Sequence, residues 1–283
     1  GSSGSNGGSP AAISAAGGGA TGGATGLSGG SGARNQSGSG GLPGAGGAAG
    51  QTVASGGSSG KSGHGSGGSG GTGVSGPWPP SETFKNPVLW EDLADLEVIR
   101  VDNTFYYTAS TMHYSPGAPI LRSYDLVNWE FVGHSVSVLD YGPTFNLSGG
   151  RAYVNGIWAS SLRYRKSNKT FYWMGCMHGG AGGFVYTATA PEGPWTKHAS
   201  IGCYYDVGLL IDDDDTMYVA YGQTTLSVAQ LSPDGFSEVK TQQVFASPSN
   251  IGTLEGSRFY KVNGTYYIIV THPPDSEYVL KSS

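Results

Sequence analysis

The chain has 283 residues, a formal net charge of −5 and only 12% charged residues, and 50 of its residues are glycine. An acidic chain without a cluster of lysine and arginine is poorly suited to nucleic acid, because neutralising phosphates requires concentrated positive charge. The sequence contains no apolar run of the roughly 18 residues that a membrane-spanning helix needs, so we expect no membrane partner.

The first 76 residues differ in composition from the rest of the chain. They contain 31 of the 50 glycines with 16 serines and 11 alanines, and no Phe, Trp or Tyr. Such a segment cannot bury enough apolar surface to offset the entropy of ordering its backbone. Three prolines, Pro77, Pro79 and Pro80, mark its end. We therefore predict a disordered Gly/Ser/Ala-rich linker over residues 1–82 and one folded domain over residues 83–283.

The folded part repeats one pattern four times. Each repeat has an apolar strand, a polar turn, a Thr and an aromatic strand, and the four Thr are Thr104, Thr170, Thr216 and Thr265. A second pair of strands follows each of the first three hairpins, over residues 120–133, 184–198 and 226–240. Four antiparallel strands repeating at about 50 residues are typical of β-propeller blades. A β-sandwich with coincidental similarity is the alternative.

The fourth repeat stops where its third strand should be running, over residues 278–283. We therefore expect three full blades and part of a fourth, in a product that is longer at both ends.

Four residues stand just before the aligned hairpins. They are Asp95, Trp158, Asp206 and Glu255. Because the first strand of each blade lines the propeller axis, these side chains should converge on one pocket. Carboxylates that share a pocket shift one another's pKa, which acid/base catalysis at neutral pH requires. A tryptophan in the same pocket suits the apolar face of a sugar ring.

Each candidate also has a purely structural interpretation. Asp95 could cap a strand beside Glu91, Asp92 and Glu97, Asp206 could be a solvated loop acid, and Trp158 could belong to the core. The acidic run 212–215 falls in a hairpin turn, and we interpret it as solvated, with calcium binding as the alternative.

Several motifs in order carry a family resemblance. They comprise residues 86–95, SYDLVNW (123–129), GIWASSLRY (156–164), YYDVGLLIDDDDTMYVAYG (204–222) and LEGSRFYKVNGTYYI (254–268). Over residues 84–283 the chain resembles glycoside hydrolase family 43, and within it the fungal arabinoxylan-active arabinofuranosidases and xylosidase-like members. The resemblance implies an all-β, five-bladed β-propeller with an axial active site, of which about three and a half blades are present. It also implies inversion of anomeric configuration.

The resemblance assigns roles residue by residue. Asp95 matches the general base, Asp206 the acid that tunes and orients, and Glu255 the general acid. Trp158 would wall the sugar subsite, with Met112 and His113 lining it. The family's base usually precedes a proline, whereas Asp95 precedes Leu96, which leaves Asp92 as a rival base.

The resemblance also implies the protein's setting. We expect a secreted, extracellular and monomeric enzyme that releases arabinofuranosyl or xylosyl units from plant cell-wall polysaccharide such as arabinoxylan. A carbohydrate-binding module upstream of the linker would suit this role. No cofactor is required, although calcium occupies the axial channel in relatives. Since the last blade supplies a substrate-contacting Arg and a central His in the family, we expect little or no turnover from this chain alone.

Two other functions remain open at this stage. A non-catalytic carbohydrate-binding propeller would need the tryptophan but not the aligned acids. A protein-interaction propeller would carry charged or apolar patches on its rim and no clustered acids in its channel. The two cysteines, Cys176 and Cys203, fall in neighbouring blades, and we hypothesise that a disulfide joins them.

Overall fold

A computed structural model describes residues 81–179, 182–273 and 275–283. The predicted linker over residues 1–82 therefore lies outside the described residues, apart from its last two. Within the described ranges the only helix is a single 3-10 turn, η1 (Pro143–Asn146). The described part accordingly contains no helix long and apolar enough to cross a membrane.

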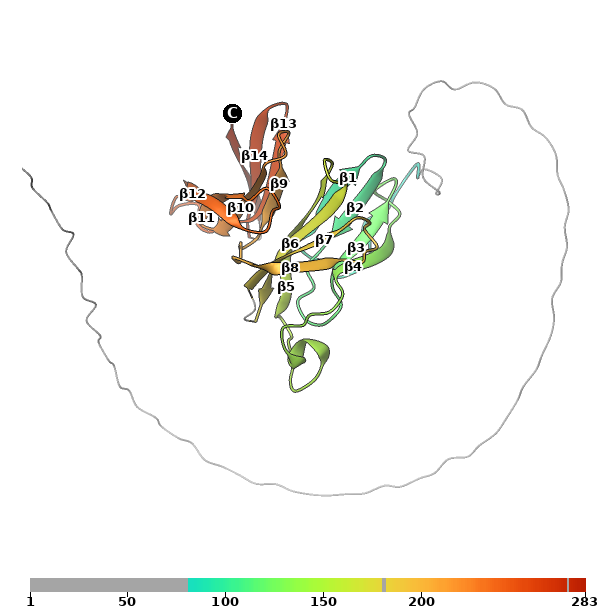
Figure 1. Cartoon of the computed structure of the whole chain (residues 1–283). Coiled ribbons are helices and arrows are strands. Elements are labelled where there is room, and N and C mark those ends of the chain that lie inside the picture. Colours follow the sequence, from blue (N-terminus) through green and yellow to red (C-terminus); the bar gives the residue numbers. More distant parts are fainter. Residues whose placement is uncertain (1–80, 180–181, 274) are drawn as a thin grey trace, which may run out of the picture. The chain divides into compact units, whose positions relative to one another are not determined.

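Fifteen strands form four antiparallel sheets, each with its strands in chain order (Figure 1). Blade one comprises β1 (Glu97–Val101), β2 (Thr104–Thr108), β3 (Gly117–Ser123) and β4 (Glu130–Val136). Blade two comprises β5 (Gly156–Arg165), β6 (Thr170–His178), β7 (Gly182–Ala188) and β8 (Thr196–Ile201). Blade three comprises β9 (Gly208–Ile211), β10 (Met217–Gln223), β11 (Thr225–Leu231) and β12 (Glu238–Ala246). Blade four comprises β13 (Glu255–Val262), β14 (Thr265–His272) and β15 (Ser276–Ser282).

This arrangement confirms the predicted propeller, with three four-stranded blades and one three-stranded blade. All four predicted hairpins form at the first two strands of a blade. Their turns contain residues in the left-handed region, among them Asp102 with φ 53° and Asn263 with φ 51°. Asp and Asn tolerate that region because their short polar side chains hydrogen-bond locally.

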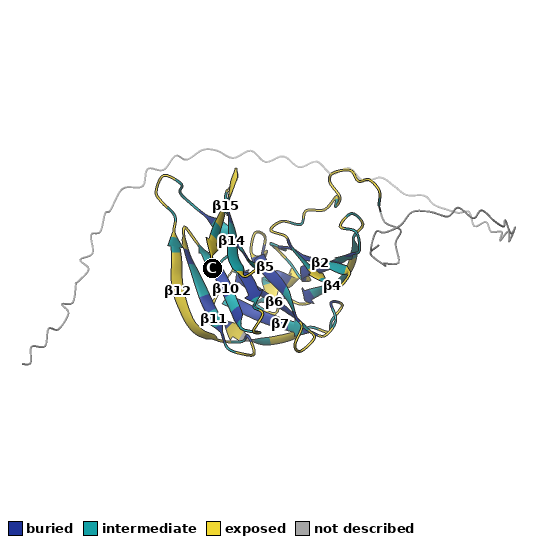
Figure 2. Cartoon of the chain, turned by 90° about the horizontal axis from the view of Figure 1, so that it is seen from above, coloured by how far each residue is buried: buried dark blue, intermediate teal, exposed yellow. Residues whose placement is uncertain are grey.

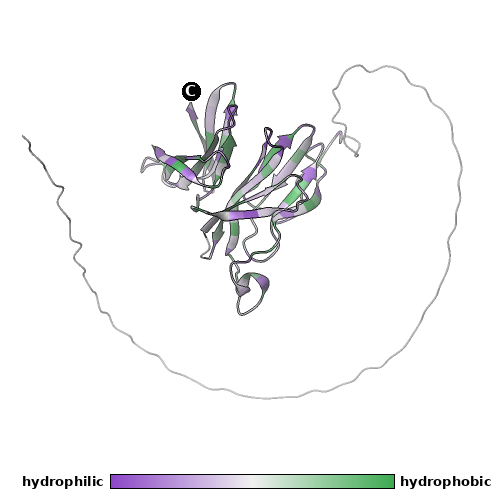
Figure 3. Ribbon diagram, viewed as in Figure 1, coloured by the Kyte–Doolittle hydropathy of each residue, from purple (hydrophilic) through white to green (hydrophobic). Residues whose placement is uncertain are grey.

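The blades pack face to face through apolar residues of their first and middle strands. One cluster joins blades one and two through Ile120, Leu162 and Trp173, and a second joins blades two and three around Met174 and Leu209. A third, between blades three and four, includes Leu226 and Val270 among its fully buried members. Figure 3 shows hydrophobic and hydrophilic residues interleaved along the strands.

The first strand of each blade lies next to the first strand of its neighbour, so that β1, β5, β9 and β13 form a consecutive series. Outer strands are more exposed, and nearly every residue of β12 is in contact with solvent (Figure 2). The residues at the start of these first strands therefore lie in one central region, although they come from four blades.

A disulfide joins Cys176 in β6 to Cys203 in the segment before β9, with the two Cα atoms 5.2 Å apart. The hypothesis of a covalent link between blades two and three is thus confirmed.

Removing this disulfide with the double substitution Cys176→Ser and Cys203→Ser is expected to lower the free energy of unfolding by about 3–4 kcal/mol. The cross-link closes a loop with a sequence separation of 27 and so restricts the unfolded chain. Denaturant titrations with and without a reductant measure the effect, and the double variant serves as the control because reductant should not change it. Equal stability of wild type and variant would contradict the prediction.

The acidic turn between β9 and β10 corrects one expectation. Asp212 and Asp215 are not simply solvated: the side chain of Asp212 is only 7% exposed and accepts bonds from Lys261 Nζ and Tyr266 Oη, both at 2.6 Å. Asp215 pairs with Arg165 of blade two at 2.5 Å. The turn therefore links blade three to both neighbours, which the sequence of the turn alone could not reveal. As for the calcium alternative, the described residues contain no group of three or more His, Cys, Asp or Glu placed to hold a metal ion.

Candidate active site

Three acids stand where a first strand begins. Asp95 and Asp206 each lie two residues before a strand, β1 and β9 respectively, and Glu255 opens β13. The backbone turns sharply at each point: φ is 52° at both Asp95 and Asp206, and 73° at Gly256. Asp tolerates the left-handed region better than most residues and Gly adopts it freely, so the sequence permits a sharp turn beside each acid.

Asp206 is influenced electrostatically by both of the other acids. Its pKa is raised to about 6, first by burial and then by the negative charges of Glu255 and Asp95, while the backbone N–H of Gly256, which donates to Oδ2 at 2.9 Å, acts in the opposite direction. Because charges act on a pKa only at short range, the effect places all three predicted acids in one electrostatic neighbourhood. Their catalytic roles remain predictions.

The predicted base, Asp95, is exposed and oriented from one side. Ser110 Oγ donates to its Oδ2 at 2.6 Å, and the Ser110 N–H donates to the carbonyl oxygen of Ala94 at 3.0 Å. Its rival Asp92 is exposed in the segment that precedes β1. The electrostatic link of Asp95 to Asp206 favours Asp95 over Asp92.

The predicted acid, Glu255, is held through a single oxygen. Gln223 Nε2 donates to Glu255 Oε2 at 2.6 Å and Tyr205 Oη donates to the same oxygen at 3.2 Å. Burial, with the charges of Asp206 and Glu255, raises the pKa of Tyr205 to about 12, so this phenol stays a neutral donor. Both donors occupy Oε2, which leaves Oε1 as the oxygen that can carry an acidic proton toward a substrate.

The predicted sugar wall, Trp158, belongs to a row of aromatic rings. His178 stacks on it with ring centroids 3.7 Å apart, and Tyr205 meets His178 edge-on at 6.2 Å. Burial lowers the pKa of His178, which favours the neutral form of the ring. The row leads from Trp158 to the phenol that contacts Glu255, and one face of the indole is already covered by His178.

The two other predicted subsite residues lie close to Trp158 in the fold. A backbone bridge pairs Thr111 with Ile157, which brings Met112 and His113 to the start of β5. His113 is exposed and stacks on Tyr153 at 5.2 Å. Their part in substrate binding stays a prediction.

Sequence reasoning missed three contributors: Tyr205, Gln223 and His178. Tyr205 precedes Asp206 directly, and Gln223 and His178 each end the second strand of a blade. That shared position is a signal the sequence carried, because the end of a second strand lies beside the start of the first strand in an antiparallel hairpin.

Replacing Asp206 with Asn is expected to raise the free energy of unfolding at pH 7 by about 1–3 kcal/mol. An acid whose folded pKa lies near 6, above its ordinary value of 3.8, contributes stability that is lost as the pH rises from about 4 through 6. Asn carries no charge and keeps an acceptor for the Gly256 N–H. Denaturant titrations at pH 3.5 and 7 check this. The variant should be more stable than wild type only at pH 7, and an equal increase in stability at both pH values would contradict the raised pKa of Asp206.

Comparison with known proteins shows the family of the chain. The family model described as "Glycosyl hydrolases family 43" matches residues 84–273. A non-reducing end alpha-L-arabinofuranosidase of Bacteroides ovatus is 33% identical over 193 residues, and a beta-xylosidase of Formosa agariphila is 29% identical over 207. Each alignment covers 66% of this chain and 36% or 34% of the relative.

Solved structures that are similar to the chain also belong to family 43. A family 43 enzyme whose engineered form displays both endo-xylanase and exo-arabinofuranosidase activity shares 53% identity at a TM-score of 0.66, over 71% of this chain and 40% of that one. A bifunctional family 43 and CE protein of Bacteroides eggerthii shares 33% identity at a TM-score of 0.62, over 70% of this chain and 27% of its own. The chain thus spans about a third of the length of the curated relatives, and it belongs to family 43 of the glycosyl hydrolases.

Proposed function

We propose that this protein is an inverting, exo-acting glycosidase that releases arabinofuranosyl or xylosyl units from a plant cell-wall polysaccharide such as arabinoxylan. The observation that carries the proposal is that three acids from three blades are joined by direct contacts. The N–H of Gly256, the residue after Glu255, donates to Asp206 at 2.9 Å, and Arg258 contacts the carbonyl oxygens of Asp95 at 2.9 Å and Val207 at 3.3 Å. The names of the relatives, an arabinofuranosidase and a xylosidase, support the sugar class.

The geometry supports a role for each acid. Glu255, with Oε1 free of the two donors, would protonate the leaving glycosidic oxygen. Asp95, exposed and aimed by Ser110, would remove a proton from water on the opposite face of the ring. Asp206, between them, orients the acid through the backbone of Gly256.

Stacking defines the binding surface. Trp158 presents an apolar ring near the acids, and its indole Nε1 donates to the carbonyl oxygen of Val154 at 3.2 Å, which fixes the ring. A pentose ring packs well on such a surface because its axial hydrogens are apolar. The disulfide supports secretion, since disulfides persist in oxidising compartments. A monomer with a carbohydrate-binding module upstream of the linker completes the proposal.

Incubation of the chain at high concentration with aryl α-L-arabinofuranoside, aryl β-xyloside and arabinoxylan tests the function. High concentration matters because we expect slow turnover from this length of chain. Release of a pentose whose first-formed anomer is inverted, detected by proton NMR, supports the proposal. Binding of arabinoxylan with no release by wild type would instead favour a carbohydrate-binding propeller.

A further inference from the structure

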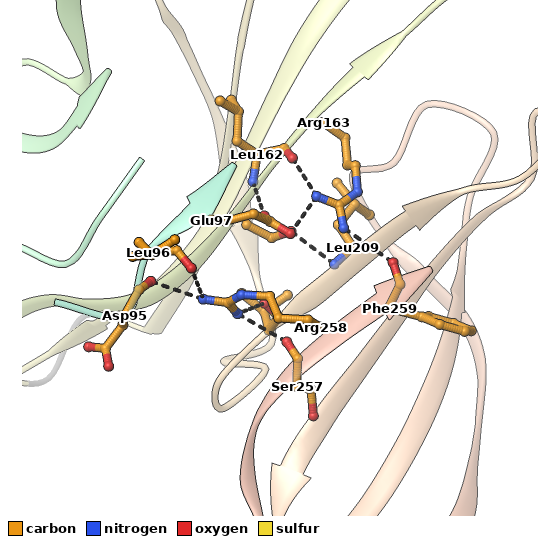
Figure 4. A network of polar contacts seen from close by, with 11 residues as sticks. Asp95, Leu96, Glu97, Leu162, Arg163, Leu209, Ser257, Arg258 and Phe259 are labelled. Carbon is orange, nitrogen blue, oxygen red and sulfur yellow. Dashed lines mark hydrogen bonds and ion pairs between the residues drawn. The ribbon is translucent and has the colours of Figure 1, made fainter. Parts of the chain in front are cut away.

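The segment that carries Asp95 is held by an arginine from another blade. Arg258, in β13, donates from Nη2 to the carbonyl oxygens of Asp95 at 2.9 Å and Leu96 at 3.2 Å (Figure 4). More than 160 residues separate the partners in sequence. Blade four therefore reaches the backbone of blade one directly across the centre of the fold.

The same guanidinium is anchored at its other end. Its Nη1 donates to the carbonyl oxygens of Ser257 at 3.0 Å and Val207 at 3.3 Å. Val207 directly follows Asp206, and Arg258 lies three residues after Glu255 in the same strand. One side chain thus contacts the backbone next to all three acids, and the planar fork of arginine fixes the relative positions of its partners.

The residue after Leu96 is held separately. Glu97, 1% exposed, accepts bonds from Ser161 Oγ at 2.6 Å and the Leu162 N–H at 2.7 Å, and it pairs with Arg163. Blade two therefore fixes the start of β1, as Figure 4 shows. The carbonyl oxygens of Asp95 and Leu96 are instead held by Arg258 of blade four.

We infer that Arg258 is a positioning residue that sets the distance and angle between the base Asp95 and the acid Glu255. The inference rests on the proposed function and adds Arg258 to the three acids as a residue that the reaction requires. Asp95 has a left-handed backbone, with φ 52°, and the hydrogen bonds from Arg258 to the carbonyl oxygens of Asp95 and Leu96 hold this turn in place.

The charge of Arg258 adds an independent readout. Its guanidinium lowers the pKa of Asp206 against the effect of burial and the two other acids. Removing the positive charge should therefore raise that pKa. A role limited to packing would not move it.

The test compares Arg258→Met, Arg258→Lys and the control Arg100→Met. The exposed guanidinium of Arg100 hydrogen-bonds to Asp102 and Asn103 in its own hairpin turn and lies over the ring of Phe105 in the same hairpin. We expect Arg258→Met to lower kcat on an aryl arabinofuranoside about 10–100-fold with KM little changed, because misplacement of a reacting group acts on kcat. Arg258→Lys should restore part of kcat, and the control should match wild type. Carbon-13 NMR of the Asp206 carboxyl should show a pKa above that of wild type in the Met variant and a pKa close to that of wild type in the Lys variant.

Each outcome decides the question. If wild type turns over and Arg258→Met leaves both kcat and the Asp206 titration unchanged, the inference is overturned while the proposed function stands. If this length of chain shows no turnover, kcat offers no comparison, and the Asp206 titration with the amide exchange of Ser110 decides: unchanged values for both in the Met variant overturn the inference. If the Met variant does not fold, the Lys variant carries the test: unchanged kcat and unchanged titration there also overturn the inference.

Discussion

Substituting Glu255 by Gln is expected to lower turnover of an unactivated arabinoxylan oligosaccharide at least about 100-fold, because the glutamine cannot protonate the leaving oxygen. Gln keeps the shape of the side chain and an oxygen that accepts from Gln223 and Tyr205, so the fold should be retained. The measurement is kcat for sugar release, with circular dichroism to verify folding.

A pair of substrates identifies which acid does what. A dinitrophenyl glycoside has a leaving group that needs little protonation, so Glu255→Gln should lose far less on it than on the oligosaccharide. Asp95→Asn should lose equally on both, because attack by water needs the base in either case. Equal losses of Glu255→Gln on the two substrates would show that Glu255 is not the acid.

A second large effect is expected at the buried ion pair of the fold's centre. Replacing Glu97 with Ala should lower the free energy of unfolding by about 3–5 kcal/mol, because it leaves the charge of Arg163 without its partner. The side chain of Glu97 is fully buried and that of Arg163 is only 12% exposed. Arg163 also donates to the carbonyl oxygen of Phe259 at 3.2 Å, so blades one, two and four meet there.

The matched control is Asp140→Ala. Asp140 pairs with Lys197 at 2.6 Å, but its side chain is 57% exposed, and pairs of that kind contribute about 0–1 kcal/mol. In denaturant titrations, Glu97→Ala should therefore lose several times more stability than Asp140→Ala. Similar small losses at the two sites would contradict the central role given to Glu97.

Local patterns predicted the strands because each hairpin combines alternation with a turn of Asp, Asn or Gly. The hairpin β13–β14 is an example: Val262 and Thr265 pair across Asn263, whose φ is 51°. Alignment of the repeats also located Asp95, Asp206 and Glu255, since a position before a first strand is recognisable once the blades are aligned. The same repeat thus predicted both the strands of the fold and the positions of the candidate acids.

Contacts between blades could not be predicted in the same way. Glu97 looked like one more acid beside Asp95, and its burial depends on Ser161 and Arg163 from another blade. Arg258 hydrogen-bonds to the carbonyl oxygen of Asp95 only because β1 and β13 both lie at the centre of the fold. Such pairings depend on how sheets are placed in space, and a single sequence specifies this only through the whole fold.

The measurement that tests the account most directly is the titration of the Asp206 carboxyl by carbon-13 NMR in wild type, Asp95→Asn and Glu255→Gln. It needs no turnover. The account predicts a pKa of about 6 in wild type and a lower value in each variant, because each substitution removes a neighbouring negative charge. An Asp206 pKa that stays the same in both variants would show that the three acids do not share one site.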